Sequence, residues 1–256
     1  MMESKNSGLP PNLETMLVSW QRWLNKSWND TLAQSKQEIE DSLTKAALFD
    51  IWSNCLQDNH ASGTLIPEIF IDCYMSIHFA CWGLYKYANS CLRSQLETAL
   101  RFIFFSTHQV EFGWWSEGNE SYRSRLGSTD VWGSGYSYLD QLDNVKRFEE
   151  ISPENRRLFA GTGRVSKIHR RLSTYVHSSV DSLQTKSEQF SPAYNRDNFY
   201  RWYDNFKEIQ SCINILLILG FLEKFRGISS LNQSSVMNTG IENSIDRESI
   251  KTLAGI

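Results

Sequence analysis

The sequence predicts an all-α fold, and three observations lead to this prediction. The 256 residues include five prolines, so long stretches contain no residue that would break a helix. Apolar residues recur at intervals of three or four positions through most of the chain, which is the spacing of an amphipathic helix. Hydrophobic residues make up 41% of the chain and aromatic residues 13%, enough for a core packed around large rings.

The N-terminal part is expected to consist of a tail and two helices. Residues 1–11 end in two prolines and are expected to form a disordered tail. Residues 12–66 form the N-terminal helical segment, with one helix over residues 12–28 and a second over residues 31–57. The first is amphipathic, with three apolar residues near helical spacing: Met16, Trp20 and Trp23. Pro67 suits the first turn of the helix that follows.

Residues 67–226 are expected to form the main helical domain. Residues 68–107 show helical spacing almost throughout, as one long helix bent near Gly83 or as two helices in series. Two further helices are predicted over residues 162–184 and residues 196–225. We expect the 68–107 and 162–184 helices to pack side by side at the centre of the domain.

Two segments are predicted to lack regular structure. Residues 111–142 combine glycines with tryptophans and tyrosines, and a loop of this length in a helical domain is often functional. Its aromatic rings either pack onto the domain or, beside Arg123 and Arg125, stack on nucleic-acid bases. Residues 227–256 are rich in Ser and Asn and poor in aromatics, so they are expected to form a disordered C-terminal tail.

Charge and cysteine content exclude several classes of protein. A net charge of -3 disfavours a general nucleic-acid binder, although a small basic site remains compatible with it. The five cysteines are widely spaced and contain no CxxC pair, which indicates reduced thiols and no zinc site. The most apolar stretch, residues 69–85, is too short and too polar to span a membrane. We therefore expect a cytoplasmic protein without a membrane segment, a metal or a cofactor.

The candidate site lies in the stretch from His169 to Ser179. Arg170 precedes His177 by seven positions and Arg171 precedes it by six, inside one predicted helix. A histidine can move the proton of a 2′-hydroxyl near neutral pH, and a guanidinium can hold the charge that develops on a phosphate. The residue types therefore suit RNA cleavage without a metal.

A rotation of about 100° per residue divides this helix into faces. The core face is predicted to hold Val165, Ile168, Leu172, Tyr175, Val176 and Leu183. The opposite face is a polar strip of Arg170, Thr174, His177 and Asp181, while Arg171 lies on a flank with Arg164 and Ser178. The simpler interpretation of the strip is an ordinary surface that faces water.

Arg170 or Arg171 followed by His177 resembles the Arg-x4-6-His signature of the HEPN superfamily, which consists of small all-helical domains common in toxins and phage-defence proteins. Residues 91–101 also look like the upstream helix of HEPN defence domains, including those of ApeA-like and abortive-infection proteins. Residues 172–178 resemble the local sequence around the histidine in that type. The resemblance extends over most of the chain and implies a HEPN-like helical bundle with residues 111–142 as a loop insertion.

The resemblance implies a catalytic role for Arg170, Arg171 and His177, with Glu97 orienting an arginine from the neighbouring helix. Thr174, Ser178 and Arg93 are the corresponding candidates for substrate binding. HEPN enzymes pair their motif helices across a two-fold axis, so a homodimer is expected with the polar strip near that axis. RNA is the expected substrate, and an antitoxin or another defence protein is a further expected partner.

Two functions follow as expectations. The first is a metal-independent endoribonuclease that acts as a toxin or abortive-infection effector in prokaryotic antiviral defence. The second is a non-catalytic HEPN-like sensor or scaffold that binds a protein or a nucleotide. The acidic net charge and the aromatic segment 111–142 suit the second function.

Overall fold

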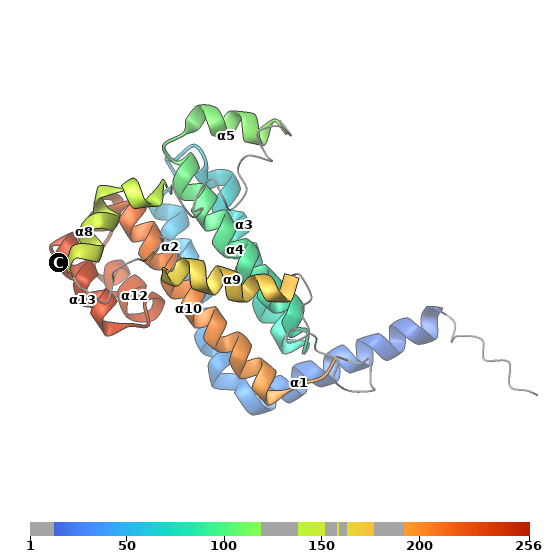
Figure 1. The fold of residues 1–256 in the computed structure, drawn as a ribbon. Coiled ribbons are helices and arrows are strands. Elements are labelled where there is room, and N and C mark those ends of the chain that lie inside the picture. The colour runs from blue at the N-terminus through green and yellow to red at the C-terminus, as the bar shows by residue number, and fades with distance from the viewer. Residues whose placement is uncertain (1–12, 119–137, 152–157, 159–162, 177–191) are drawn as a thin grey trace, which may run out of the picture.

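Helices form the regular structure of the described residues, which in this computed structural model are 13–118, 138–151, 158, 163–176 and 192–256. Within these ranges there is no β-strand, so the prediction of an all-α fold is confirmed (Figure 1). None of the helices described combines the length and the apolar character that crossing a bilayer requires. The tail expected over residues 1–11 lies outside the described residues.

The 68–107 region forms two helices, α3 (Ser62–Cys81) and α4 (Tyr85–Phe105), that fold back on each other. The reversal occurs at Gly83, whose φ of 72° lies in the left-handed region. A Cβ at this position would stand 2.4 Å from the carbonyl oxygen of Ala193, so a side chain does not fit. The Ser76 hydroxyl donates to the carbonyl of Ala88 at 2.9 Å across the pair.

The helix start expected at Pro67 is wrong, because α3 already begins at Ser62 and Pro67 lies inside it. The amide of Leu65 donates to the carbonyl of Ala61 at 3.0 Å, so the helix is established before the proline. A proline this close to a helix start removes one backbone hydrogen bond and leaves the later turns intact.

The N-terminal segment forms one long helix, α1 (Leu13–Ala46), and a short one, α2 (Leu48–Cys55). The break expected between one helix ending at residue 28 and a second beginning at residue 31 is absent. Instead, α1 is kinked at Ser35, where φ is −142° and ψ is 35°. The later half of α1 packs on the body of the protein, whereas its N-terminal half extends away from it (Figure 1).

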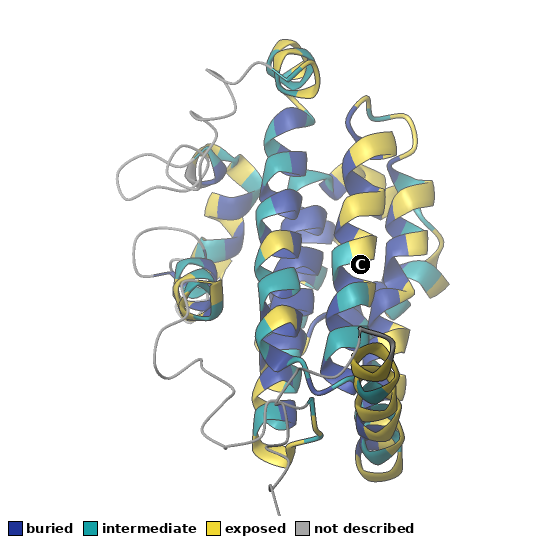
Figure 2. Ribbon diagram, turned by 90° about the vertical axis from the view of Figure 1, so that its right-hand side faces the viewer, coloured by how far each residue is buried: buried dark blue, intermediate teal, exposed yellow. Residues whose placement is uncertain are grey.

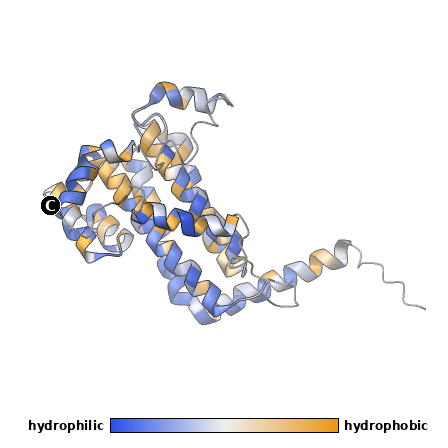
Figure 3. Cartoon of the chain, in the orientation of Figure 1, coloured by the Kyte–Doolittle hydropathy of each residue, from blue (hydrophilic) through white to orange (hydrophobic). Residues whose placement is uncertain are grey.

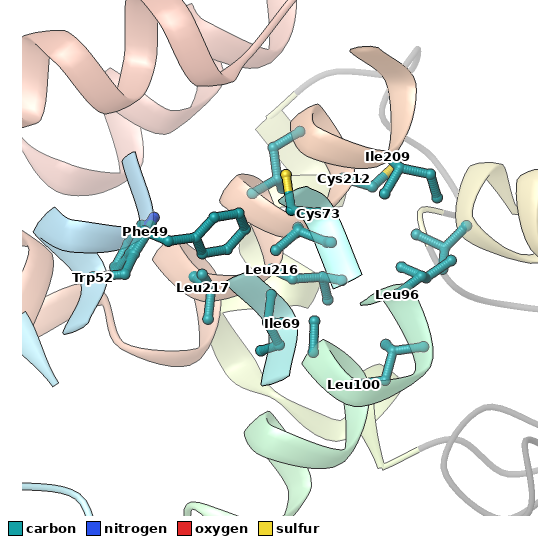
Figure 4. Close-up of a cluster of buried hydrophobic side chains, with 14 of the residues drawn as sticks. Phe49, Trp52, Ile69, Cys73, Leu96, Leu100, Ile209, Cys212, Leu216 and Leu217 are labelled. Atoms are coloured by element: carbon teal, nitrogen blue, oxygen red, sulfur yellow. The ribbon is translucent and has the colours of Figure 1, made fainter. Parts of the chain in front are cut away.

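The central helix of the core is α10 (Arg196–Gly220), which packs against α4 and α1. Figure 2 shows that buried residues line the inner faces of the long helices, and Figure 4 shows Leu96 and Leu100 of α4 near Ile209 and Leu216 of α10. Buried amide side chains also join the two helices, since Asn205 donates to Asn89 at 2.7 Å and Gln210 donates to Gln95 at 2.9 Å. These paired amides fix how α4 and α10 align.

The motif helix, α9 (Arg164–Val176), packs on α4 and also contacts α10. The predicted contact of the motif helix with the 68–107 region is present in the described part of both. The predicted side-by-side position at the centre of the domain is wrong, because α10 occupies the centre beside α4 and α9 crosses these two longer helices on the outside of the bundle (Figure 1). The outer side of α9 is exposed, at Lys167, Arg170, Arg171 and Thr174.

The disordered tail expected over residues 227–256 is wrong. After α11 (Leu222–Gly227), the chain forms α12 (Ser230–Gly240) and α13 (Ser244–Ala254), and α13 packs on α8 (Asp143–Ile151). Ser229 and Asn243 cap the two helices by accepting hydrogen bonds from backbone amides. A few apolar residues suffice to hold this region in the core, and they are Val236, Ile241, Ile250 and Leu253.

The irregular segment expected over residues 111–142 is partly helical. Its beginning belongs to α5 (Gln109–Ser116), and its end contains a short 3₁₀ helix, η1 (Leu139–Gln141). The rings of Phe112 and Trp115 pack on Phe105 of α4, with centroids 5.6 and 5.4 Å away. These described aromatics favour packing over base stacking, while residues 119–137, including Arg123 and Arg125, lie outside the described residues.

Candidate functional site

The orientation of α9 follows from its buried face. Val165, Ile168 and Leu172 are fully buried, as the helical spacing predicts, and Tyr175 is partly buried against the core. Val176, which was expected on the same face, is 42% exposed. The buried face of α9 thus ends at Tyr175 in the described part of the helix.

A group of ionisable side chains lies between α4 and α9, and we call Arg93, Glu97, Arg101 and His169 the Glu97 cluster. Glu97 Oε1 lies 2.9 Å from Arg93 Nε and 2.9 Å from His169 Nε2. Glu97 Oε2 lies 3.5 Å from Arg101 Nη2. All four side chains are between 15% and 29% exposed, so the cluster is shielded from water but not sealed.

Glu97 is ionised in this setting. Burial raises the pKa of its carboxyl, but the hydrogen bond from His169 and the charges of Arg93 and Arg101 outweigh burial and lower the pKa below its ordinary value. Two guanidinium charges therefore stand against one carboxylate charge. The net charge of the cluster is positive even when His169 is neutral, so this part of the surface attracts anions.

The proton positions in the cluster follow from this charge. An ionised Glu97 can only accept hydrogen bonds, so His169 Nε2 carries a hydrogen atom and donates a hydrogen bond to Glu97 Oε1. Arg93 Nε also lies 3.3 Å from His169 Nε2, but a protonated ring nitrogen has no lone pair with which to accept from it. Glu97 thus fixes the tautomer of His169, as carboxylates do for histidines in many proton-transfer sites.

The structure brings some of the predicted site residues together and separates others. Glu97 and Arg93 meet, but the α9 residue that Glu97 contacts is His169, not Arg170 or Arg171. Arg171 turns to the other flank of α9 and pairs with Glu208 of α10 at 2.5 Å. Thr174 is exposed, and its hydroxyl donates to the carbonyl of Arg171 at 2.7 Å.

Arg170 is exposed and, among the residues that the structure describes, has no hydrogen-bond or ion-pair partner. It is therefore a cation of α9 that can reach an external anion without breaking a contact inside the protein. The remaining residues of the predicted strip, His177 and Asp181, lie outside the described residues, as does Ser178.

Sequence reasoning missed the role of His169. The signal was present, because a rotation of 100° per residue places position 169 next to Val165 and Leu172 on the edge of the core face. A histidine at that edge is expected to be half-buried and to face a neighbouring helix. Which residue it meets there depends on the packing of α9 against α4, and the spacing along one helix does not contain this information.

On the opposite flank of α9, Arg164 forms a bidentate ion pair with Asp246 of α13. Arg164 Nη1 lies 2.5 Å from Asp246 Oδ2, and Arg164 Nη2 lies 3.2 Å from Asp246 Oδ1. A surface pocket of about 230 Å³ lies beside this pair and is lined by Arg164, Asp204, Lys207, Glu208, Ser211, Cys212, Glu242 and Asn243. Its charges are already neutralised, since Lys207 pairs with Asp204 and Glu242 pairs with Lys45. This pocket is therefore less suited to a charged ligand than the Glu97 cluster.

The described residues contain no group of three His, Cys, Asp or Glu side chains that a metal ion could use. Burial raises the pKa of the Cys212 thiol to about 12, despite the nearby Arg164, and it raises the pKa of the Cys81 thiol to about 12 as well. Neither thiol is ionised near neutral pH, so neither is a ready nucleophile.

The lowered pKa of Glu97 predicts how acid affects the protein. A carboxyl with a lowered pKa contributes stability above its unfolded-state pKa, and this stability is lost as the pH falls through the folded-state pKa. We therefore expect Glu97→Gln to reduce the acid-dependent loss of stability, measured by urea unfolding at about pH 6 and about pH 3. A pH dependence equal to that of the wild type would contradict the ion pairing described above.

The chain matches no protein-family model, and the comparisons with curated proteins and with solved structures find no match either.

Proposed function

We propose that this protein is a metal-independent endoribonuclease that acts at the open side of α9, as a toxin or abortive-infection effector in prokaryotic antiviral defence. The observation that carries the proposal is the Glu97 cluster beside the exposed Arg170. Through His169 the cluster holds α9 against α4, and its net positive charge lies on the helix that carries the Arg-x4-6-His pattern. The resemblance to HEPN domains supplies the reaction class.

In the proposed reaction, His177 takes the proton of a ribose 2′-hydroxyl. The 2′-oxygen then forms a bond to the adjacent phosphorus while the bond from phosphorus to the 5′-oxygen breaks. The leaving 5′-oxygen takes a proton from water and His177 releases its proton to water, so the products carry a 2′,3′-cyclic phosphate and a 5′-hydroxyl. Arg170 pairs with the phosphate oxygens as their charge grows, and such charge stabilisation is often the largest contribution to catalysis.

Local charge supports an RNA substrate. Lys167, Arg170 and Arg171 are exposed on α9, whose outer side is largely hydrophilic (Figure 3). Arg93 and Arg101 of α4 add positive charge on the flank of α9 that carries His169. The chain as a whole is acidic, so this concentration of cations differs from the average surface. A short basic surface of this kind suits a few phosphates of one strand, not a long duplex.

The proposal is tested by expression of the wild type beside His177→Ala, and by incubation of each purified protein with RNA. We expect the wild type to stop growth and to cut RNA in the presence of EDTA, leaving 2′,3′-cyclic phosphate ends. Loss of a proton-transfer group lowers the rate by about 10²–10⁴-fold, so His177→Ala is expected to permit growth.

The alternative is a non-catalytic sensor or scaffold, and one observation favours it. Glu97 already has Arg93, Arg101 and His169 as partners, and an ion network of this kind can simply join two helices. If the purified wild type cuts no RNA and His177→Ala affects growth as the wild type does, the scaffold function is the better account.

A further inference from the structure

The N-terminal half of α1 carries an apolar face that nothing in the described chain covers. Trp20 and Trp23 are each 42% exposed, Met16 is 50% exposed and Leu17 is 59% exposed. The rings of Trp20 and Trp23 are in edge contact, with centroids 6.2 Å apart. Soluble proteins rarely expose several large apolar side chains side by side unless that surface binds a partner.

These residues occupy one side of the helix, because they recur at intervals of three and four positions and Leu24 continues the series. The same side runs on into Ser27 and Thr31, which are buried against the turn between α3 and α4. Their hydroxyls lie 3.3 and 3.1 Å from the carbonyl oxygen of Cys81. The protein therefore covers this side of α1 from Ser27 onwards and leaves the preceding turns open.

We propose that a second copy of the chain covers the open turns, with the two α1 helices antiparallel and a two-fold axis at Trp20. In this arrangement Met16 lies opposite Leu24, and Leu17 lies opposite Trp23. Figure 1 shows that the N-terminal half of α1 extends well beyond the body, so the two bodies lie at opposite ends of the helix pair and do not collide. Each partner helix begins beside the α3–α4 turn of the other copy.

The area that this pairing buries suits a dimer with a small interface. A fully exposed aromatic side chain has about 150–250 Å² to bury, and Trp20 and Trp23 are 42% exposed, so together with Met16, Leu17 and Leu24 they offer roughly 400 Å² for each copy. A standard protein interface buries about 800 Å² on each side, so this pairing lies at the small end of the range. Trp28, whose ring packs against His78 of α3 with centroids 5.5 Å apart, adds apolar surface where the partner helix begins.

Two other arrangements are less suitable, namely a membrane on this face of α1 and a dimer formed through α9. An anionic membrane would need a row of cations beside the apolar face, but the exposed cations of these turns are Arg22 and Lys26. The open side of α9, in turn, bears Lys167 and Arg170, so pairing it with its own copy would oppose like charges. The structure thus offers α1, and not α9, as the apolar surface that joins two copies.

The double substitution Leu17→Glu with Trp20→Glu tests this interface in the full chain. It places four carboxylates along the proposed two-fold axis, and we expect it to raise the dissociation constant of the dimer at least about 100-fold. Light scattering at micromolar concentration should then show a dimer for the wild type and a monomer for the variant. Both side chains are exposed, so the melting temperature of the monomer should barely change.

Leu231→Glu is the matched control, because Leu231 is 75% exposed on α12 and lies outside the proposed interface. A second measurement uses Trp20→Cys, which should form a disulfide between copies under mild oxidation, whereas Arg22→Cys on the opposite side of α1 should not. A monomeric wild type, or a dimer that survives the double substitution, would overturn the proposal. Binding of the wild type to vesicles of phosphatidylcholine and phosphatidylserine, lost in the double variant, would assign this face to a membrane instead.

Discussion

Replacing Arg164 with alanine is expected to lower the free energy of unfolding by about 3–5 kcal/mol. Asp246, its partner on α13, has a side chain that is 1% exposed, and among the described residues it pairs with Arg164 alone. Without the guanidinium, the Asp246 carboxylate remains buried and uncompensated, and this is the costly outcome of removing one half of a buried ion pair. Urea unfolding of the wild type and of Arg164→Ala measures the difference.

Arg171→Ala provides the matched control. Arg171 lies on the same helix and also has an acidic partner, but the side chains of Arg171 and Glu208 are 48% and 34% exposed. Exposed ion pairs contribute about 0–1 kcal/mol, so this substitution should barely change the unfolding curve. Equal losses for the two variants would mean that burial of Asp246 does not govern the effect.

The second large effect is expected on RNA cleavage. Arg170→Ala should lower the rate by about 10²–10³-fold, because it removes one donor to the charge that develops on the phosphate. The melting temperature should stay near that of the wild type, since Arg170 is exposed and its side chain supports no other described residue. Cleavage rates under single-turnover conditions and thermal melts of the same samples test both parts of this prediction.

Lys167→Ala separates a specific role of Arg170 from a general effect of positive charge. Lys167 is also exposed on α9 and carries the same charge, but it is not part of the Arg-x4-6-His pattern. A comparable loss of activity in Lys167→Ala would indicate that α9 attracts RNA through charge alone. In that case Arg170 would have no particular place in the reaction.

The helical spacing was sufficient to predict the strongly periodic elements. It predicted the all-α fold and the burial of Val165, Ile168 and Leu172. It did not predict the helices after residue 227, because Ser and Asn dilute their apolar pattern and a few buried residues such as Ile241 and Leu253 carry the packing. It also left the geometry at Gly83 open, since a glycine permits a bend and a reversal equally well.

The candidate site was less accessible to sequence reasoning. Glu97 was expected to face the motif helix, and it does reach α9, but at His169. Arg171 shares its flank with Arg164, as the helical rotation implies, yet the pairing of these arginines with Glu208 and Asp246 depends on α10 and α13. Contacts between helices far apart in the sequence determine the site, and periodicity within one helix does not describe them.

The link between Arg164 and Asp246 also orders events during synthesis. Residues 164–176 are synthesised before residues 244–254, so Arg164 has no buried partner until α13 has been made. The contacts of α9 with α4 need only residues that precede α9 in the chain. A chain that is still being translated can therefore make those contacts but lacks the ion pair that joins the start of α9 to α13.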